Sequence, residues 1–468
     1  MLSSSFINSF GDKRLDTRGN KFVSELLLRG THSIRQISQD SAGLKGNYRF
    51  LENNRTNETA IINNMTSRCA SAVKGKVLLS IQDTSEINLY NHKNRLKIDG
   101  SLGTTNAPKY GLGFMIHPSL VVDAKDCFPY GYCDIHMWNR SLEKETKLPK
   151  VKHNYKKLPI EAKESNKWQA SSKATKKVLK EAETVIIIQD REGDIYEQFA
   201  TIPNEQTHLL IRAKSNRILS DGEKFFSKLS LCEKSGEYEI KIEGDKRKGQ
   251  NKRLAKLEVR FTEVEIKNTS RTAKQAAATV KLWAVEAREA GTTLKKQIYW
   301  RLLTTIPVTN LNEALMIIEW YSWRWIIEEV FRILKKEGFN IEGSELESGK
   351  SIKKLCLLML DAIIKIFQMR IAWEETEEEG KQATICFTES EIEFAEIQCK
   401  KMEGKTEKLK NPYKKFTLRN VTWVIARLGG WKGYASDRKP GITTLWIGLE
   451  KFYDRYNGWM MANDVSTR

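Results

Sequence analysis

The chain lacks the cysteine patterns of disulfide-rich and zinc-binding proteins. Its 7 cysteines among 468 residues are scattered, odd in number and nowhere arranged as C-x-x-C. A disulfide framework needs paired cysteines, and a structural zinc site usually needs closely spaced ones. The pattern therefore argues against both, and it is typical of a protein in a reducing cytoplasm.

Signals for secretion and membrane insertion are also missing. The first residues show no basic stretch followed by an apolar core, so we expect no signal peptide. The longest apolar stretch, LCLLMLDAIIKIF at 355–367, is interrupted by Asp361 and Lys365. Because it is too short to cross a bilayer, it predicts a core helix, and we expect a cytoplasmic protein without a membrane partner.

Negative charge is scarce relative to positive charge. The chain has 78 Lys and Arg against 59 Asp and Glu, a net charge of +19. This balance favours polyanionic partners such as DNA, RNA or an anionic membrane surface, although a basic soluble enzyme has a similar composition. With 40% hydrophobic residues, the chain has enough apolar material for the two to four domains that its length suggests.

The order of expected elements indicates an α/β protein with helical ends. Residues 1–70 show helical periodicity and carry basic residues, so they form either a DNA-backbone binder or a solvated amphipathic module. Alternating and continuous apolar runs then predict strands and one helix. In chain order these are strands at 76–83, 110–124 and 128–138, a helix at 164–182, and a buried strand at 185–190.

The second half of the chain begins with strands and ends with helices. A strand-rich region covers 208–305, and its basic run DKRKGQNKRLAK at 245–256 predicts a hairpin tip or loop, either solvated or lying along phosphates. Long helices are expected at 311–338 and 345–373. An acidic linker and two further helices follow, at 374–382, 389–402 and 417–428.

Three carboxylates lie on elements that are able to bring them together. The stretch VIIIQDREGDIY ends a buried strand in Asp190, and IQDTSE ends the first strand in Asp83. The first long helix carries Glu328. Two aspartates at the ends of neighbouring strands and a helical glutamate supply the hard oxygen ligands that two Mg²⁺ ions require for phosphoryl transfer.

The same helix offers groups that bind phosphate. Helical spacing places Tyr321, Arg324 and Lys335 on the face of Glu328. Such groups would hold phosphates near a scissile bond. Taken alone, an aspartate after a strand is ordinary loop chemistry and such a helix face is usually a salt-bridged surface. The combination, in a chain of net charge +19, favours metal-dependent phosphodiester chemistry.

These residues resemble a known signature. The stretch YSWRWIIEEVFRILK at 321–335 matches the Y-(2)-R-(3)-E-(6)-K signature of the DDE transposases of bacterial insertion sequences, specifically the IS-four type that includes the transposon-five enzyme. The two aspartates match the DT of IQDTSE and the DRE-x-D of QDREGDI. Softer similarity extends over GDKRLDTR, GNYRF, KESNKW, RLGGW and GITTLWIGLEKF.

The resemblance implies a fold and a division into domains. A ribonuclease-H-like catalytic core, a mixed sheet flanked by helices, would occupy residues 71–375 and would be interrupted by a β-rich insertion at about 205–300. A helical domain at 1–70 would bind DNA. A helical C-terminal domain at 376–468 would mediate dimerisation.

The resemblance also implies roles for single residues. Asp83, Asp190 and Glu328 would be the catalytic ligands of two Mg²⁺ ions, for which Mn²⁺ would substitute. Trp300 falls where the family has a tryptophan that stacks on a flipped base; a half-buried strand tryptophan is the alternative. The remaining DNA contacts would come from Tyr321, Arg324, Lys335, Arg212, Lys214, Arg14, Arg18, Lys246, Arg247, Lys248, Lys252 and Arg253.

We therefore expect a cut-and-paste transposase that acts as a homodimer on double-stranded DNA in the bacterial nucleoid. It would bind terminal inverted repeats, cleave a strand, form and reopen a hairpin, and transfer the end into target DNA. Two alternatives stay open. One is a structure-selective nuclease on the same fold, and the other is a non-catalytic DNA-binding repressor or decayed copy.

Overall fold

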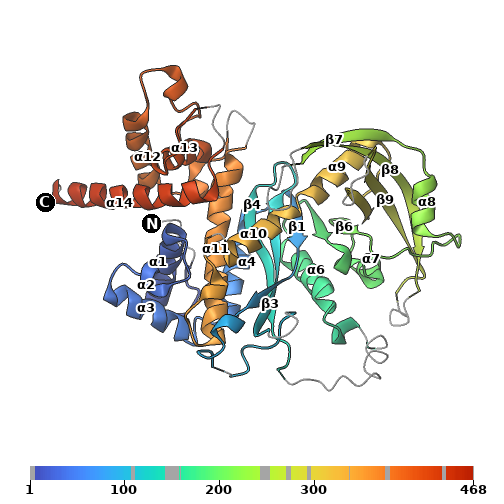
Figure 1. Cartoon of the computed structure of the whole chain (residues 1–468), viewed down its shortest axis with the longest axis horizontal. Helices are drawn as coiled ribbons and strands as arrows, with labels where there is room; N and C mark the ends of the chain where they lie inside the picture. Colours follow the sequence, from blue (N-terminus) through green and yellow to red (C-terminus); the bar gives the residue numbers. More distant parts are fainter. Residues whose placement is uncertain are drawn as a thin grey trace.

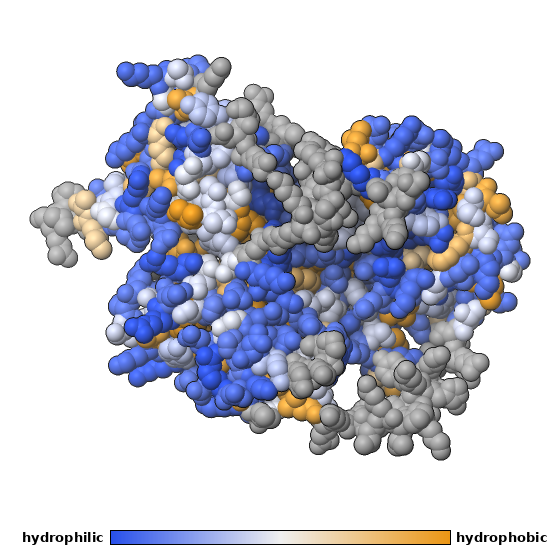
Figure 2. All heavy atoms as spheres, viewed as in Figure 1, coloured by the Kyte–Doolittle hydropathy of each residue, from blue (hydrophilic) through white to orange (hydrophobic). Residues whose placement is uncertain are grey.

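A computed structural model describes residues 6–97, 99–106, 111–142, 158, 160–242, 253–269, 276–291, 297–336, 338–374, 380–434 and 439–466. Figure 1 shows a large curved sheet on one side of the molecule and helical groups from the two chain ends on the other, with a long central helix between them. In Figure 2 the surface facing the viewer is mainly hydrophilic, with hydrophobic residues in scattered patches.

The N-terminal segment folds into four helices. These are α1 (Lys13–Arg29), α2 (Ile34–Ile37), α3 (Ser41–Glu52) and α4 (Glu58–Ala72). The side chains of Asp12, Asp40 and Asn57 accept hydrogen bonds from backbone N–H groups in the first turns of α1, α3 and α4, which satisfies donors that have no partner within the helix. The expected helical character of residues 1–70 is confirmed.

A mixed five-strand core forms the centre of the sheet. Its spatial order is β4-β3-β1-β5-β6, with β1 antiparallel to β3, β3 antiparallel to β4, and β5 and β6 parallel to β1. This antiparallel meander followed by parallel strands is the ribonuclease-H-like arrangement, so the expected fold class is confirmed. The elements are β1 (Val77–Gln82), β2 (Ser85–Asn88), β3 (Gly113–Asp123), β4 (Pro129–Trp138), α6 (Asn166–Val178), β5 (Thr184–Gln189), α7 (Tyr196–Thr201) and β6 (Thr207–Arg212).

Four further strands extend this sheet beyond β6. They follow in the order β10 (Tyr299–Thr304), β9 (Thr279–Glu289), β8 (Arg253–Lys267) and β7 (Gly236–Ile242), each antiparallel to its neighbour. Helix α8 (Phe225–Leu231) packs on β8. Although expected within the insertion, β6 pairs in parallel with β5 and continues the core. The β-rich extension and the core thus form one sheet, curved as Figure 1 shows.

The helix expected over 311–338 is two helices. They are α9 (Leu311–Ser322) and α10 (Trp325–Lys335). Between them the hydrogen bonds tighten from i→i−4 to i→i−3, since the N–H of Arg324 donates to the carbonyl of Tyr321 and that of Ile326 to that of Trp323. The prediction of one continuous helix is therefore wrong at this turn.

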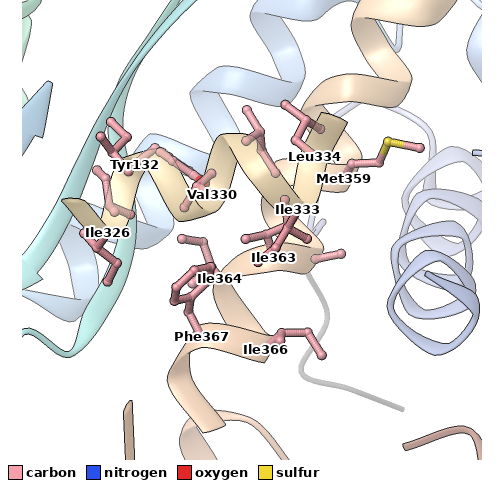
Figure 3. Packing of buried hydrophobic residues seen from close by; sticks show 14 of the residues in the cluster. Tyr132, Ile326, Val330, Ile333, Leu334, Met359, Ile363, Ile364, Ile366 and Phe367 are labelled. Carbon is pink, nitrogen blue, oxygen red and sulfur yellow. The ribbon is translucent and has the colours of Figure 1, made fainter. Parts of the chain in front are cut away.

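The long central helix α11 (Gly349–Ala372) organises the interior. Its residues 355–367 are all buried, which confirms the expected core helix. Figure 3 shows Ile326, Val330, Ile333 and Leu334 of α10 packed close to Met359, Ile363 and Ile364 of α11. This packing holds the apolar face of α10 inward and leaves its polar face for other contacts.

The C-terminal segment packs against both α11 and the N-terminal helices. It contains α12 (Glu389–Met402), α13 (Leu418–Leu428) and α14 (Ile442–Ser466), of which α14 was not expected. Gly448 lets α14 cross α13 closely, because a Cβ there would lie 1.9 Å from the carbonyl oxygen of Ile425. An ion pair between Arg29 and Glu450 links α14 to α1, from opposite ends of the chain.

Two expected absences concern cysteines and membrane helices. All 7 cysteines are free, and all but Cys232 are buried, in agreement with the absence of a disulfide framework. Within the described ranges, no helix has the length and apolar composition that crossing a bilayer demands. The described residues also contain short 3-10 helices, at Tyr90–His92, Ile160–Ala162, Arg191–Gly193, Ile341–Gly343, Ala383–Ile385 and Glu407–Leu409.

Candidate active site

Strand pairing places Asp83 beside Asp190. Strands β1 and β5 are parallel neighbours, with Leu79 opposite Ile186 and Ile81 opposite Ile188. Continuing this register by two residues brings Asp83 opposite Asp190, each directly after the end of its strand. Neighbouring strands lie about 4.8 Å apart, so the two carboxylates share one edge of the sheet.

The strand period of two decides which face these aspartates occupy. Ile186 and Ile188 belong to the core that includes α9, α10 and α11, whereas Val185 and Ile187 belong to a second core on the side of α7. Because side chains alternate along a strand, Asp190 lies on the same face of the sheet as Ile186 and Ile188. Asp83 lies on the corresponding face of β1. Both carboxylates therefore fall on the sheet face that α9 and α10 cover.

The glutamine before each aspartate lies on the opposite face. The side-chain amide of Gln189 donates to the Gln82 side chain at 2.8 Å and to Ser172 of α6 at 3.0 Å. Gln198 of α7 donates to Gln189 at 2.7 Å. All three glutamines are buried, so this network fixes the ends of β1 and β5 relative to each other. In the sequence, this glutamine network is indicated by the Gln-Asp pair that occurs in both SIQD and IIQD.

Arg324 joins the strand edge to α10. Its Nη1 donates to Asp83 Oδ2 at 2.9 Å, and its Nη2 donates to Glu328 Oε1 at 2.7 Å. The guanidinium is buried, at 6% exposure of the side chain, while that of Glu328 is 40% exposed. One cation thus bridges two carboxylates that lie far apart in the sequence.

Tyr321 connects α9 to the other aspartate. Its hydroxyl donates to Asp190 Oδ1 at 3.4 Å, and burial, followed by the charge of Asp190, raises the pKa of Tyr321 to about 12. The half-buried ring of Trp300 meets the Tyr321 ring edge-on, with centroids 5.6 Å apart. Arg212 lies close enough to affect the pKa of Tyr321, and it donates to the carbonyl of Tyr299 at 2.9 Å.

Asp83 is held in an environment that disfavours its charge. Burial raises the pKa of Asp83 to about 6, against the opposing effect of Arg324, and the charges of Glu328 and Asp190 add to the increase. The backbone N–H of Thr84 donates to Asp83 Oδ1 at 2.7 Å. The Thr84 hydroxyl hydrogen-bonds His117 Nδ1 at 2.9 Å, and this fully buried histidine, which was not expected in the site, supports the turn.

The raised pKa of Asp83 predicts a pH-dependent effect of Asp83→Asn on stability. A carboxyl whose pKa is higher in the folded than in the unfolded state loses stability as pH rises from about 4 to about 6. The asparagine variant has no such loss. Its free energy of unfolding, relative to the wild type, should increase by about 2 kcal/mol between pH 4 and pH 7. Urea unfolding at the two pH values measures this; a difference that does not change with pH would contradict the burial argument.

An open cavity adjoins the two aspartates. Its volume is about 620 Å³, and its lining includes Asp83, Asp190, Lys214 and Lys167. The two lysines come from different elements, and they bring positive charge beside the carboxylates. A polyanion in this cavity would meet both metal-binding and phosphate-binding types of side chain.

The remaining carboxylates of the DREGD turn have structural partners. The side chain of Asp194 is completely buried, pairs with Arg217, and accepts hydrogen bonds from the backbone N–H groups of Lys214 and Ser215 at 2.8 and 3.0 Å. Glu192 is exposed and pairs with Lys167 at 3.5 Å. Asp194 thus builds the turn that carries Lys214, whereas Asp190 contacts Tyr321 of α9.

Comparison with known proteins gives two family matches. Residues 7–56 match a family described as transposase DNA-binding, and residues 154–364 match one described as transposase DDE domain. The second match contains Asp190 and Glu328. Both matches support a DDE transposase. A solved piggyBac transposase synaptic complex with hairpin DNA is 10% identical, with a TM-score of 0.34 over 81% of this chain and 70% of that one.

Arg14 and Arg18 lie within the region that matches the transposase DNA-binding family. Both are on α1, where Arg14 is exposed and Arg18 is half-buried against Gly46 of α3. They line an open groove of about 540 Å³ together with Lys13 and Lys21. Their face of α1 is therefore strongly basic, and this groove shares no lining residue with the cavity beside Asp83 and Asp190.

Other residues expected to contact DNA are not grouped with the carboxylates. Lys335, at the end of α10, pairs with Glu342 at 3.4 Å rather than with Glu328. Arg253 lies in β8 and not in a loop, and it forms an ion pair with the buried Glu289. The remaining loop residues, Lys246, Arg247, Lys248 and Lys252, lie outside the described residues.

Asp83, Asp190 and Glu328 have suitable chemistry for a metal but not the arrangement. Carboxylate oxygens are the hard ligands that Mg²⁺ and Mn²⁺ prefer. Yet in the described part of the chain, no three His, Cys, Asp or Glu side chains are grouped closely enough to hold a metal ion. The guanidinium of Arg324 occupies the contact position between Asp83 and Glu328.

Proposed function

We propose that this chain is a cut-and-paste DNA transposase of the IS-four type, with Asp83, Asp190 and Glu328 as its catalytic carboxylates. The observation that carries the proposal is the position of Asp83 beside Asp190 at the ends of neighbouring parallel strands, with Glu328 joined to Asp83 through Arg324. The transposase family matches and the net charge of +19 support DNA as the substrate.

The three carboxylates would hold a pair of divalent ions, Mg²⁺ or in its place Mn²⁺. Such ions activate an attacking hydroxyl and stabilise the leaving oxygen of a phosphodiester. The side chains beside them have complementary tasks. Arg324 would bind a phosphate as a bidentate hydrogen-bond donor, and Lys214 would bind phosphate through its single positive charge. Tyr321 supports Asp190 and presents its ring to Trp300, which would stack on an extruded base.

The remaining parts of the chain would recognise the DNA ends. Helices in residues 1–70 would bind the terminal repeats through Arg14 and Arg18, and residues 376–468 would pair two protomers. Residues 71–375 would form the catalytic domain. The proposed reaction order is strand cleavage, hairpin formation, hairpin opening and strand transfer, since each step is an in-line attack on a phosphodiester at the same carboxylates.

Metal removal tests this proposal. Labelled duplexes taken from the DNA directly flanking the gene are incubated with the purified protein and Mg²⁺, with and without a chelator. Specific strand cuts and hairpin products are expected with Mg²⁺, and chelation should abolish them while a gel shift of the same duplex persists. Precut ends should join to plasmid DNA. Cutting without joining would favour a nuclease, and a gel shift without cutting would favour a non-catalytic binder.

A further inference from the structure

Arg324 holds the two carboxylates that a metal would need. Its Nη1 and Nη2 are 2.9 Å from Asp83 and 2.7 Å from Glu328, so each carboxylate already has a cation in hydrogen-bonding contact. The residue is buried at 5% exposure. A charge-assisted pair away from water is considerably stronger than the same pair at the surface.

A guanidinium and a divalent ion compete for the same carboxylate oxygens. Both are cations that need direct contact with Asp83 and Glu328, and they cannot share the space between these side chains. Among the described residues, no three metal-binding side chains are grouped closely enough to hold the ion elsewhere. Metal entry therefore requires Arg324 to leave at least one of the two carboxylates.

The position of Arg324 allows it to change partner. It lies in the tight turn between α9 and α10, outside both regular helices. Its Nε is buried and, among the described residues, has no hydrogen-bond acceptor. A third acceptor would therefore improve its bonding. A phosphate group can accept from two guanidinium N–H groups at once, and it carries the charge that Arg324 would otherwise take from the carboxylates.

We infer that Arg324 blocks divalent-metal binding in the DNA-free protein and that a DNA phosphate releases the block by drawing the guanidinium away. The inference rests on the proposed function for the identity of the phosphate. By linkage, metal and DNA then strengthen each other's binding. The protein would acquire its metals mainly on DNA, so that the free protein has little capacity for metal-dependent cutting.

Metal affinity without DNA tests the block. Mn²⁺ binding to the full-length, DNA-free protein is measured by electron paramagnetic resonance for the wild type, Arg324→Gln and Arg332→Gln. Arg332 is a matched control, because it lies on the adjoining helix α10, its substitution removes the same charge, and it pairs with Glu329 at 3.9 Å. Arg324→Gln should bind Mn²⁺ about tenfold or more tightly than the wild type, since a buried cation no longer competes. Arg332→Gln should change the affinity by less than about twofold.

Two further variants assign the signal to this site. Adding Asp83→Asn to Arg324→Gln should remove the gained affinity, because one of the two released carboxylates is gone. Arg324→Lys keeps the charge but reaches one carboxylate at a time, so its affinity should lie between those of the wild type and Arg324→Gln. If Arg324→Gln does not fold, Arg324→Lys replaces it in the measurement of Mn²⁺ affinity. Equal Mn²⁺ affinities in the wild type and either Arg324 variant would overturn the inference.

The result separates this inference from the proposed function. If the wild type cuts DNA but Arg324→Gln gains no metal affinity, the block is wrong and the transposase proposal stands. If Arg324→Gln gains affinity but the wild type never cuts, the block stands and the proposed activity fails. Saturating the wild type with a short duplex should raise its Mn²⁺ affinity, whereas the same duplex should have little effect on Arg324→Gln.

Discussion

Glu328→Gln is expected to reduce Mg²⁺-dependent DNA cleavage by about a thousandfold or more. The amide has nearly the same shape as the carboxylate, but it removes one of the three negative charges that would hold the metals. It also removes one of the two anions that Arg324 contacts. Binding of terminal-repeat DNA should persist, because the helices expected to bind it lie elsewhere. Single-turnover cleavage assays and gel shifts measure the two effects separately.

Glu329→Gln is the matched control. Glu329 is the next residue of α10, yet its carboxylate pairs with Arg370 of α11 and not with Arg324. The pair is partly exposed, so its loss should lower the free energy of unfolding by about 1 kcal/mol at most. Cleavage should stay within a few-fold of the wild type. Equal loss of cleavage in both variants would show that α10 tolerates no change, and the assignment of Glu328 would lose its support.

Asp194→Ala is expected to destabilise the fold by about 3–5 kcal/mol. The substitution leaves the guanidinium of Arg217 with its charge unpaired at 12% side-chain exposure, and it removes the acceptor for two backbone N–H groups. Burying an unpaired charge is among the most costly single changes in a protein. Chemical unfolding of the variant and the wild type gives the difference directly.

Asp190→Ala separates structure from chemistry within the same turn. Asp190 is half-buried, and the hydrogen bond that its carboxylate accepts from the Tyr321 hydroxyl is long, at 3.4 Å. Its removal should alter the free energy of unfolding by no more than about 1 kcal/mol. Cleavage should nevertheless be abolished while DNA binding persists. Cleavage by a stable Asp190→Ala variant would refute the carboxylate assignment, and a stable Asp194→Ala variant would refute the turn assignment.

These two aspartates answer a question that the sequence raises. A buried strand, VIIIQ, ends in the charged run DREGD. The charge serves two purposes in the fold. Asp190 faces the helices that carry the rest of the candidate site. Asp194 stabilises the neighbouring turn by accepting a hydrogen bond from the backbone N–H of Lys214. Glu192 remains a solvent-exposed partner of Lys167.

Local pattern determined much of the fold and the candidate residues. The alternation of apolar residues marks β1 and β5, and helical periodicity marks α6, α11, α12 and α13. Because a strand has a period of two, the position of Asp190 after Ile186 and Ile188 also sets the face on which it lies. The spacing of Tyr321, Arg324 and Glu328 similarly places three polar side chains close together. Such features depend on a few neighbouring residues, so the sequence shows them directly.

Long-range pairing decided the rest. The pairing of β1 with β5 brings Asp83 beside Asp190, and Arg324 joins Glu328 of α10 to Asp83. The parallel position of β6, the break before Trp325 and the capture of two carboxylates by Arg324 have the same origin. Each of these features depends on contacts between residues that are far apart in the sequence. The residues of one short segment do not determine which distant residues they contact after folding.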